Sequence, residues 1–263
     1  FCTGENDNPN PDDFPATMGL QQKHTGRSVR FLELMEGRKS LSYEGLKEIK
    51  YDSRMKFPLY TRTIENLDQM RHLDPAKYPK IADVIDAMNR WDGNTEADNR
   101  QATLFALAVK HYIKYLREEG TTDYNNTLPE RVLADGLYYA KDHLNRHFGK
   151  WEVPLGDVQK HVRGDKEFPI WGVPEAITQT WTKDHEKGKF KSYLGDSYIL
   201  FIRFDKEREF PQLESVSPYG ASNRPESPHY TDQMELYVNK QLKPMTMDES
   251  IIREGAKRVY HPR

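Results

Sequence analysis

Two histidines spaced for one helix face are the first residues that could carry chemistry. His143 and His147 lie four apart in a segment with helical periodicity, so both imidazoles could face one metal ion. A pair of this kind more often lies on a solvated surface, and no residue between the two offers a general base. We therefore predict no metal at this pair.

A second candidate is the Ser227-Pro228-His229-Tyr230 sequence. Ser227 and His229 are separated by a single proline, so the hydroxyl and the imidazole need not face each other. We predict a structural loop histidine that is hydrogen-bonded to backbone, rather than a catalytic Ser-His pair.

An acidic cluster near the N-terminus could supply oxygen ligands for calcium. Its members are Glu5, Asp7, Asp12 and Asp13, and they lack the spacing of an EF-hand. The sequence also contains no H-E-x-x-H, no Walker glycine loop, no G-x-S-x-G and no G-x-G-x-x-G. Cys2 is the single cysteine, which excludes an internal disulfide and a Cys-rich metal site. We predict a solvated acidic loop and no self-contained catalytic motif.

The overall charge excludes two classes of partner. In 263 residues, Lys and Arg number 39 and Asp and Glu 41, so no net field attracts nucleic acid or an anionic membrane. The sequence has no apolar run long enough to span a bilayer, and its N-terminus has no signal pattern. We predict no nucleic-acid partner and no membrane partner.

The elements that would position these residues divide into three segments. Residues 1–20 are rich in Asn, Asp, Pro and Gly, which predicts a loop. Residues 21–150 show apolar stripes at helical spacing, which predict six helices. We expect these at 27–36, 42–49, from near 61 to 70, 77–91, 100–119 and 129–148.

Residues 151–263 have a different character. Glycines and prolines break the segment up to about residue 195, residues 197–204 (SYILFIRF) predict a buried strand that pairs with 213–216, and 233–238 predict a short helix. The predicted class is α+β, mostly helical with a small β portion.

The loop from Tyr219 to Gln233, YGASNRPESPHYTDQ, is too irregular for a helix or strand and is predicted to lock one conformation. It resembles the G-x-S-x-x-P-x-S-P-H-Y-x-D-Q signature near the C-terminus of the penicillin acylase family. These are N-terminal-nucleophile (Ntn) amidases that include acyl-homoserine-lactone and aculeacin acylases. The family usually has Gln and Gly where this chain has Ala221 and Asn223.

Further landmarks of that family occur in the same order along the chain. They are the Cys2–Pro9 loop with Phe14-Pro15, then Arg27, then Trp91-Asp92-Gly93, then Gly195-Asp196-Ser197-Tyr198. Each motif is short and weak by itself, but together with the Tyr219–Gln233 loop they resemble the family over nearly the whole chain.

The resemblance implies an Ntn-hydrolase αββα sandwich, with segments 1–20, 21–150 and 151–263 forming one continuous part of this larger domain. It implies an N-terminal Ser nucleophile whose own α-amino group is the base. It also implies that an Asn from the loop matching residues 1–10 donates to the oxyanion and that the arginine matching Arg27 holds this Asn. Thr3 occupies the Asn position, whereas Asn6 and Asn8 lie in a longer loop. Either Thr3 donates its hydroxyl, or the loop brings Asn6 in, or the amidase chemistry is lost. The predicted site residues are Thr3, Asn6 and Arg27.

The resemblance also implies partners and a location. Because position 1 is Phe, not Ser, Cys or Thr, we expect a C-terminal part of the β-chain, inactive alone, with the α-chain and the N-terminal part of the β-chain as partners. The substrate would be an acylated amine, and the location periplasmic or secreted. We expect no cofactor, since Met18 stands where some members have an aspartate that binds calcium. The alternative, favoured by Thr3, is a non-catalytic helical binding or structural domain that retains the acylase scaffold.

Overall fold

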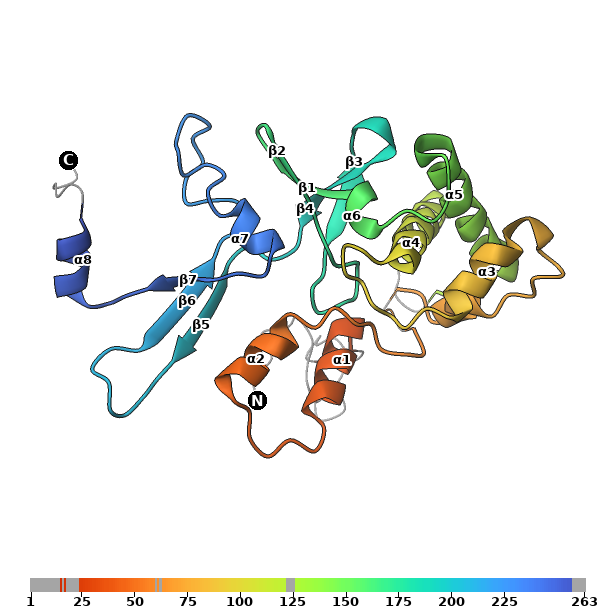
Figure 1. Cartoon of the computed structure of the whole chain (residues 1–263). Coiled ribbons are helices and arrows are strands. Elements are labelled where there is room, and N and C mark those ends of the chain that lie inside the picture. The colour runs from red at the N-terminus through yellow and green to blue at the C-terminus, as the bar shows by residue number, and fades with distance from the viewer. Residues whose placement is uncertain are drawn as a thin grey trace. The chain divides into compact units, whose positions relative to one another are not determined.

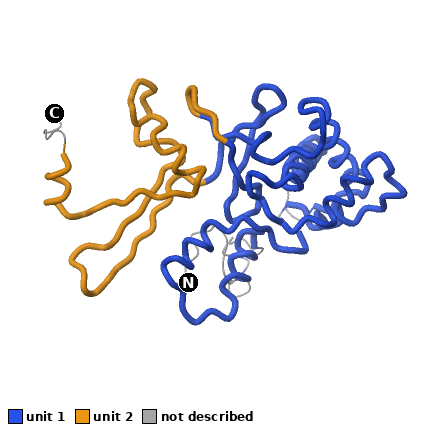
Figure 2. The backbone as a smooth tube through the Cα atoms, in the orientation of Figure 1, with its two compact units in different colours: residues 1–162, 169–195 blue, residues 163–168, 196–263 orange. Residues whose placement is uncertain are grey.

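The computed structural model describes residues 15, 17, 24–59, 61, 63–121 and 126–256. The chain forms two compact units, which Figure 2 distinguishes by colour. Unit 1 comprises residues 1–162 and 169–195, and unit 2 comprises residues 163–168 and 196–263. No helix in the described ranges is both long and apolar enough to cross a membrane.

Unit 1 is mostly helical (Figure 1). Its α-helices and 3-10 helices (η) are α1 Gly26–Met35, α2 Tyr43–Lys50, η3 Leu67–Arg71, η4 Pro79–Ile81, α3 Ala82–Asn89, α4 Arg100–Glu118, α5 Glu130–Phe148, α6 Leu155–Val158 and η5 Glu186–Gly188.

A small sheet completes this unit. It includes β1 Gln159–Arg163, β3 Trp181–Asp184 and β4 Phe190–Leu194. The sheet order is β2-β1-β4-β3, so the edge strand β2 Lys166–Pro169, most of which belongs to unit 2, pairs with β1. β1 pairs with β4 in parallel, with Gln159 opposite Phe190, and β3 pairs with β4 antiparallel. The boundary between the two units falls within the β1–β2 hairpin.

The core of unit 1 lies between α4 and α5. Tyr112 on α4 is fully buried and donates from its hydroxyl to the carbonyl of Leu133 on α5 at 2.7 Å. Gly136 allows this close approach, because a Cβ at that position would overlap the Tyr112 ring. Burial of the apolar faces of these helices excludes water from a continuous core.

Unit 2 contains a three-stranded antiparallel sheet in the order β5-β6-β7. The strands are β5 Ile199–Arg203, β6 Gln212–Val216 and β7 Lys243–Met245, and the helices are α7 Met234–Val238 and α8 Glu249–Gly255. The predicted pairing of β5 with β6 is confirmed. The predicted burial of the whole strand is wrong, because Ile199 and Phe201 are buried whereas Leu200 and Ile202 are about 40% exposed on the other face.

Four of the six predicted helices are confirmed as α1, α2, α4 and α5, and the α+β class is confirmed. Side chains cap two of them: Ser42 accepts from the amide of Gly45 at the start of α2, and Asn99 accepts from that of Ala102 at the start of α4. Gly149 ends α5 with φ of +77°, a left-handed conformation that glycine adopts without strain.

Two helix predictions are wrong in extent. The helix expected from near Thr61 is only η3, because the Thr61 hydroxyl accepts from the amide of Ile64 and fixes a turn there. The helix expected at 77–91 begins as α3 at Ala82, since Pro79 starts the separate 3-10 turn η4. Strands β1 to β4 were not predicted, because each has only four or five residues between glycines and prolines.

Candidate active-site elements

Arg27 is the predicted site residue that falls within the described part of the chain. It lies in the first turn of α1 and is partly buried. Thr3 and Asn6 lie outside the described residues, as does the acidic cluster of Glu5, Asp7, Asp12 and Asp13. The candidate site is therefore built from the elements that hold α1.

The N-terminus of α1 is fixed by its own cap and by a distant carboxylate. The Thr25 hydroxyl accepts from the amide of Ser28 at 3.2 Å, and both side chains are buried. The Gly26 amide donates to Glu175 Oε2 at 2.7 Å, across 149 residues of sequence. A carboxylate beside the positive end of the helix dipole is stabilising. Sequence reasoning did not identify Glu175.

Glu175 belongs to a buried loop that has little freedom to move. Glu175 has φ of +72°, which is unfavourable for a side chain with a Cβ and requires support from its surroundings. Gly172 supplies part of that support: its amide donates to Thr95 O at 2.9 Å, and its carbonyl accepts from Gln159 Nε2 at 2.7 Å. A Cβ on Gly172 would overlap the backbone of Thr178. The only sequence signal was a segment of glycines, prolines and large aromatic residues.

The middle of α1 is anchored to the residues that follow α2. Arg30 donates from Nε and Nη2 to the two carboxylate oxygens of Asp52, both at 2.9 Å, and from Nη1 to Glu33 at 2.7 Å. The hydrogen bond that Arg30 donates to Asp52, followed by the one it donates to Glu33, raises the pKa of Arg30. The hydrogen bond from Arg30, followed by that from Lys56, lowers the pKa of Glu33. Arg27, one turn before Arg30, is thus carried by a helix held at two points.

The Tyr219–Gln233 loop, in unit 2, is locked around Arg163. The Arg163 guanidinium lies over the rings of Tyr219 and Tyr230, at 4.9 Å and 4.1 Å from their centroids. It also donates to the carbonyl of Ser222 at 3.3 Å and to Asn223 Oδ1 at 3.2 Å. The loop therefore folds on a cation, and the prediction of one locked conformation is consistent with these contacts.

His229 differs from its prediction. Its imidazole Nδ1 lies 2.8 Å from Asp232 Oδ2, so its partner is a carboxylate rather than backbone. The Ser227 hydroxyl accepts from the backbone amide of His229, not from the ring. The two side chains therefore do not form a Ser-His pair, and this part of the prediction is confirmed.

The Trp91-Asp92-Gly93 landmark has a structural role. The Met55 amide donates to Gly93 O at 3.0 Å, and Asp92 pairs with Arg54 at 2.9 Å. Gly93 has φ of +80°, and a Cβ there would lie 2.8 Å from Met55 O. This motif joins the start of the α4 segment to the chain after α2, which in turn anchors α1.

His143 and His147 lie on one face of α5, with ring centroids 4.6 Å apart. His143 Nε2 is 2.7 Å from the carbonyl of Gly188, and its ring stacks on Phe190. Burial is the largest influence on the pKa of His143 and lowers it. The contacts of the His143 ring with the Gly188 carbonyl and with Phe190 give it a packing role between α5 and η5.

The family model for penicillin amidase matches residues 1–254, so the chain belongs to the penicillin amidase family. The prediction of the family is thereby confirmed.

Two curated relatives are acyl-homoserine lactone acylases PvdQ. That from Pseudomonas syringae pv. syringae (strain B728a) is 28% identical over 107 residues, covering 40% of this chain and 13% of the relative. That from Pseudomonas savastanoi pv. phaseolicola (strain 1448A / Race 6) is 28% identical over 105 residues, covering 39% and 13%.

Among solved structures, the thermostable penicillin G acylase from Alcaligenes faecalis aligns with a TM-score of 0.47 and 15% identity. The alignment covers 93% of this chain and 53% of that chain. The matches thus span 13% of the length of the curated relatives and about half of this structural neighbour.

Proposed function

We propose that this chain is part of an Ntn amidohydrolase that cleaves the bond between an acyl group and an amine. The observation that carries the proposal is the family match over residues 1–254. The acyl-homoserine lactone acylases among the relatives support an N-acylated amine as substrate.

In the proposed reaction, the nucleophile is an N-terminal Ser outside these 263 residues. Its hydroxyl attacks the amide carbonyl while its α-amino group accepts the proton, and that proton then leaves with the amine. Water attacks the resulting acyl-enzyme ester and releases the carboxylic acid. Thr3 or Asn6 donates a hydrogen bond to the oxyanion of each tetrahedral intermediate.

Arg27 acts in this proposal as a positioning residue. Its support is the double anchorage of α1, by Glu175 at the first turn and by Asp52 through Arg30. A guanidinium on a helix held at both points can orient the loop that carries Thr3 and Asn6 without moving during the reaction.

The proposal includes the remaining α-chain and the N-terminal part of the β-chain as partners, so that segments 1–20, 21–150 and 151–263 form one continuous part of a larger domain. It needs no metal or cofactor. Export to the periplasm or the medium is proposed from the family alone.

The test uses the complete precursor and an acyl-homoserine lactone, with the released amine measured. We expect Asn6→Ala or Thr3→Ala to lower kcat about 100-fold, as loss of one oxyanion donor does. Arg27→Gln should lower kcat with little change in KM, because it acts through another residue. The matched control is Lys39→Ala, an exposed residue beyond α1.

Mass spectrometry and N-terminal sequencing under denaturing conditions complete the test. A companion chain beginning with Ser supports the proposal. If wild-type activity survives both Thr3→Ala and Asn6→Ala within tenfold, the site assignment is wrong. If the processed, assembled protein releases no amine, the hydrolase proposal is wrong and the alternative of a non-catalytic binding or structural domain is favoured.

A further inference from the structure

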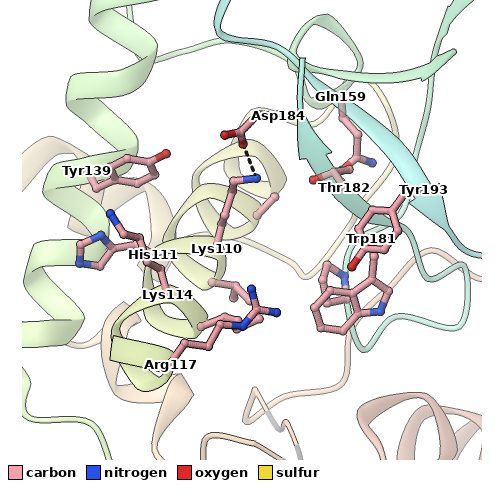
Figure 3. A pocket seen from close by; sticks show the side chains of 14 residues that line it. Lys110, His111, Lys114, Arg117, Tyr139, Gln159, Trp181, Thr182, Asp184 and Tyr193 are labelled. Carbon is pink, nitrogen blue, oxygen red and sulfur yellow. Dashed lines mark ion pairs between the residues drawn. The ribbon is translucent and has the colours of Figure 1, made fainter. Parts of the chain in front are cut away.

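Unit 1 contains a pocket of about 590 Å³ between α4, α5 and the strands β3 and β4 (Figure 3). Lys110, Lys114 and Arg117 line it from α4, at helical spacing on one face. Trp181 from β3 and Tyr193 from β4 line the other side. Arg27, the predicted site residue that the structure describes, does not line it.

Two of the three cations have partners. Lys110 pairs with Asp184 at 2.8 Å, and the two opposite charges leave no net charge at this part of the pocket. The Lys110 ammonium also lies over the Phe190 ring. Lys114 lies 3.6 Å from Glu118, an exposed pair that is weak in solvent. Among the described residues, no ion pair or side-chain hydrogen bond engages the Arg117 guanidinium. Arg117, which is exposed, and the weakly paired Lys114 therefore both offer positive charge to a ligand in the pocket.

Part of the wall is aromatic and aliphatic, and Gln159 and Thr182 add polar groups. Tyr139, Trp181 and Tyr193 surround the space together with aliphatic side chains of α4. Figure 3 shows Arg117 and Trp181 on opposite sides of the pocket, with Tyr193 beside Trp181. His111 also lines the pocket, and burial is the largest influence on its pKa and lowers it.

These features fix the class of ligand. A flat aromatic body can stack on Trp181 and Tyr193 while a carboxylate accepts two parallel hydrogen bonds from Arg117. The planar fork of the Arg117 guanidinium matches the two oxygens of a carboxylate, which favours a monocarboxylate as the ligand. Small-molecule sites commonly combine such apolar walls with one or two polar anchors.

We propose that this pocket is a binding site for aromatic monocarboxylates, with Arg117 as the anion anchor and Trp181 as the stacking surface. This proposal does not depend on the proposed amidase chemistry.

The test is calorimetric titration of the 263-residue chain with 2-naphthoate, compared with the neutral 2-naphthylmethanol of similar shape. We expect naphthoate to bind with a Kd below roughly 1 mM and the alcohol at least tenfold more weakly, since a charged hydrogen-bonded contact is lost. Arg117→Gln should weaken naphthoate binding about tenfold and leave the alcohol unchanged.

The matched control is Arg131→Gln, an exposed arginine on α5 outside the pocket. Naphthoate should also quench tryptophan fluorescence in the wild type and in Arg131→Gln, and this quenching should disappear in Trp181→Phe. Circular dichroism establishes that each variant is folded. The proposal fails if wild type binds no naphthoate at several millimolar, if the alcohol binds equally well, or if Arg117→Gln and Arg131→Gln bind alike.

Discussion

Arg163 shows how one side chain can organise a signature loop. Its guanidinium stacks on Tyr219 and Tyr230 and donates to two oxygens of the intervening turn. Gly220 adds to the lock, because a Cβ there would overlap the carbonyl of His229. Planar stacking and several directed N–H groups are properties of arginine that lysine lacks.

We therefore predict that Arg163→Lys loosens residues 219–233. Hydrogen exchange followed by mass spectrometry should show at least about tenfold faster exchange in this loop, since roughly 1 to 2 kcal/mol of cation–π and hydrogen-bond energy is lost. Arg203→Lys, at an exposed position on β5, is the control and should leave the loop unchanged. Equal exchange in both variants would contradict a role for Arg163 in the lock.

At the scale of elements, α4 and α5 are held together by a close approach rather than by large side chains alone. Tyr112 fills the space above Gly136, and its hydroxyl is satisfied by Leu133 O. Burial raises the pKa of Tyr112, so the phenol stays protonated and remains a donor at every ordinary pH.

We predict that Gly136→Ala destabilises the chain, although alanine favours a helix over glycine by about 1 kcal/mol. Overlap of the new methyl group with the Tyr112 ring should lower the free energy of unfolding by about 1 to 3 kcal/mol, measured by urea denaturation. Gly255→Ala on α8, where a Cβ meets open space, is the control and should cause little change. An unchanged or raised stability for Gly136→Ala would show that Tyr112 can move aside.

At the scale of the whole molecule, the two units differ in their apolar cores. The main hydrophobic cluster lies entirely in unit 1 and runs from Met55 to Phe190. In unit 2 the buried apolar side chains are few: Ile199, Phe201, Leu213, Val216, Met234 and Tyr237. Because burial of apolar area is the main stabilising contribution, the local stability of the two units should differ.

We predict that amides in β5 and β6 exchange with solvent at least about 100-fold faster than those in the middle of α4 and α5, a difference of roughly 3 kcal/mol in opening free energy. Hydrogen exchange of the 263-residue chain at neutral pH, resolved by peptide, measures this. Equal protection of the two regions would mean that the chain opens as one cooperative unit.

Local sequence determined the helices well. Apolar spacing and capping residues located α4 and α5 to within one residue at their ends, because both signals arise from neighbours in the chain. The family followed from short landmarks in order, and the family match bears it out.

Tertiary structure decided the contacts that give those landmarks their roles. Glu175 lies on the N-terminus of α1 from 149 residues away, and Arg163 lies between two tyrosines more than 50 positions later. Such contacts leave no periodic trace in the sequence, because each depends on where the intervening helices and strands bring the chain back. The pocket lined by Arg117 also depends on tertiary structure. The helical spacing of α4 gives only its basic side, and the short strands β3 and β4 bring in Trp181 and Tyr193.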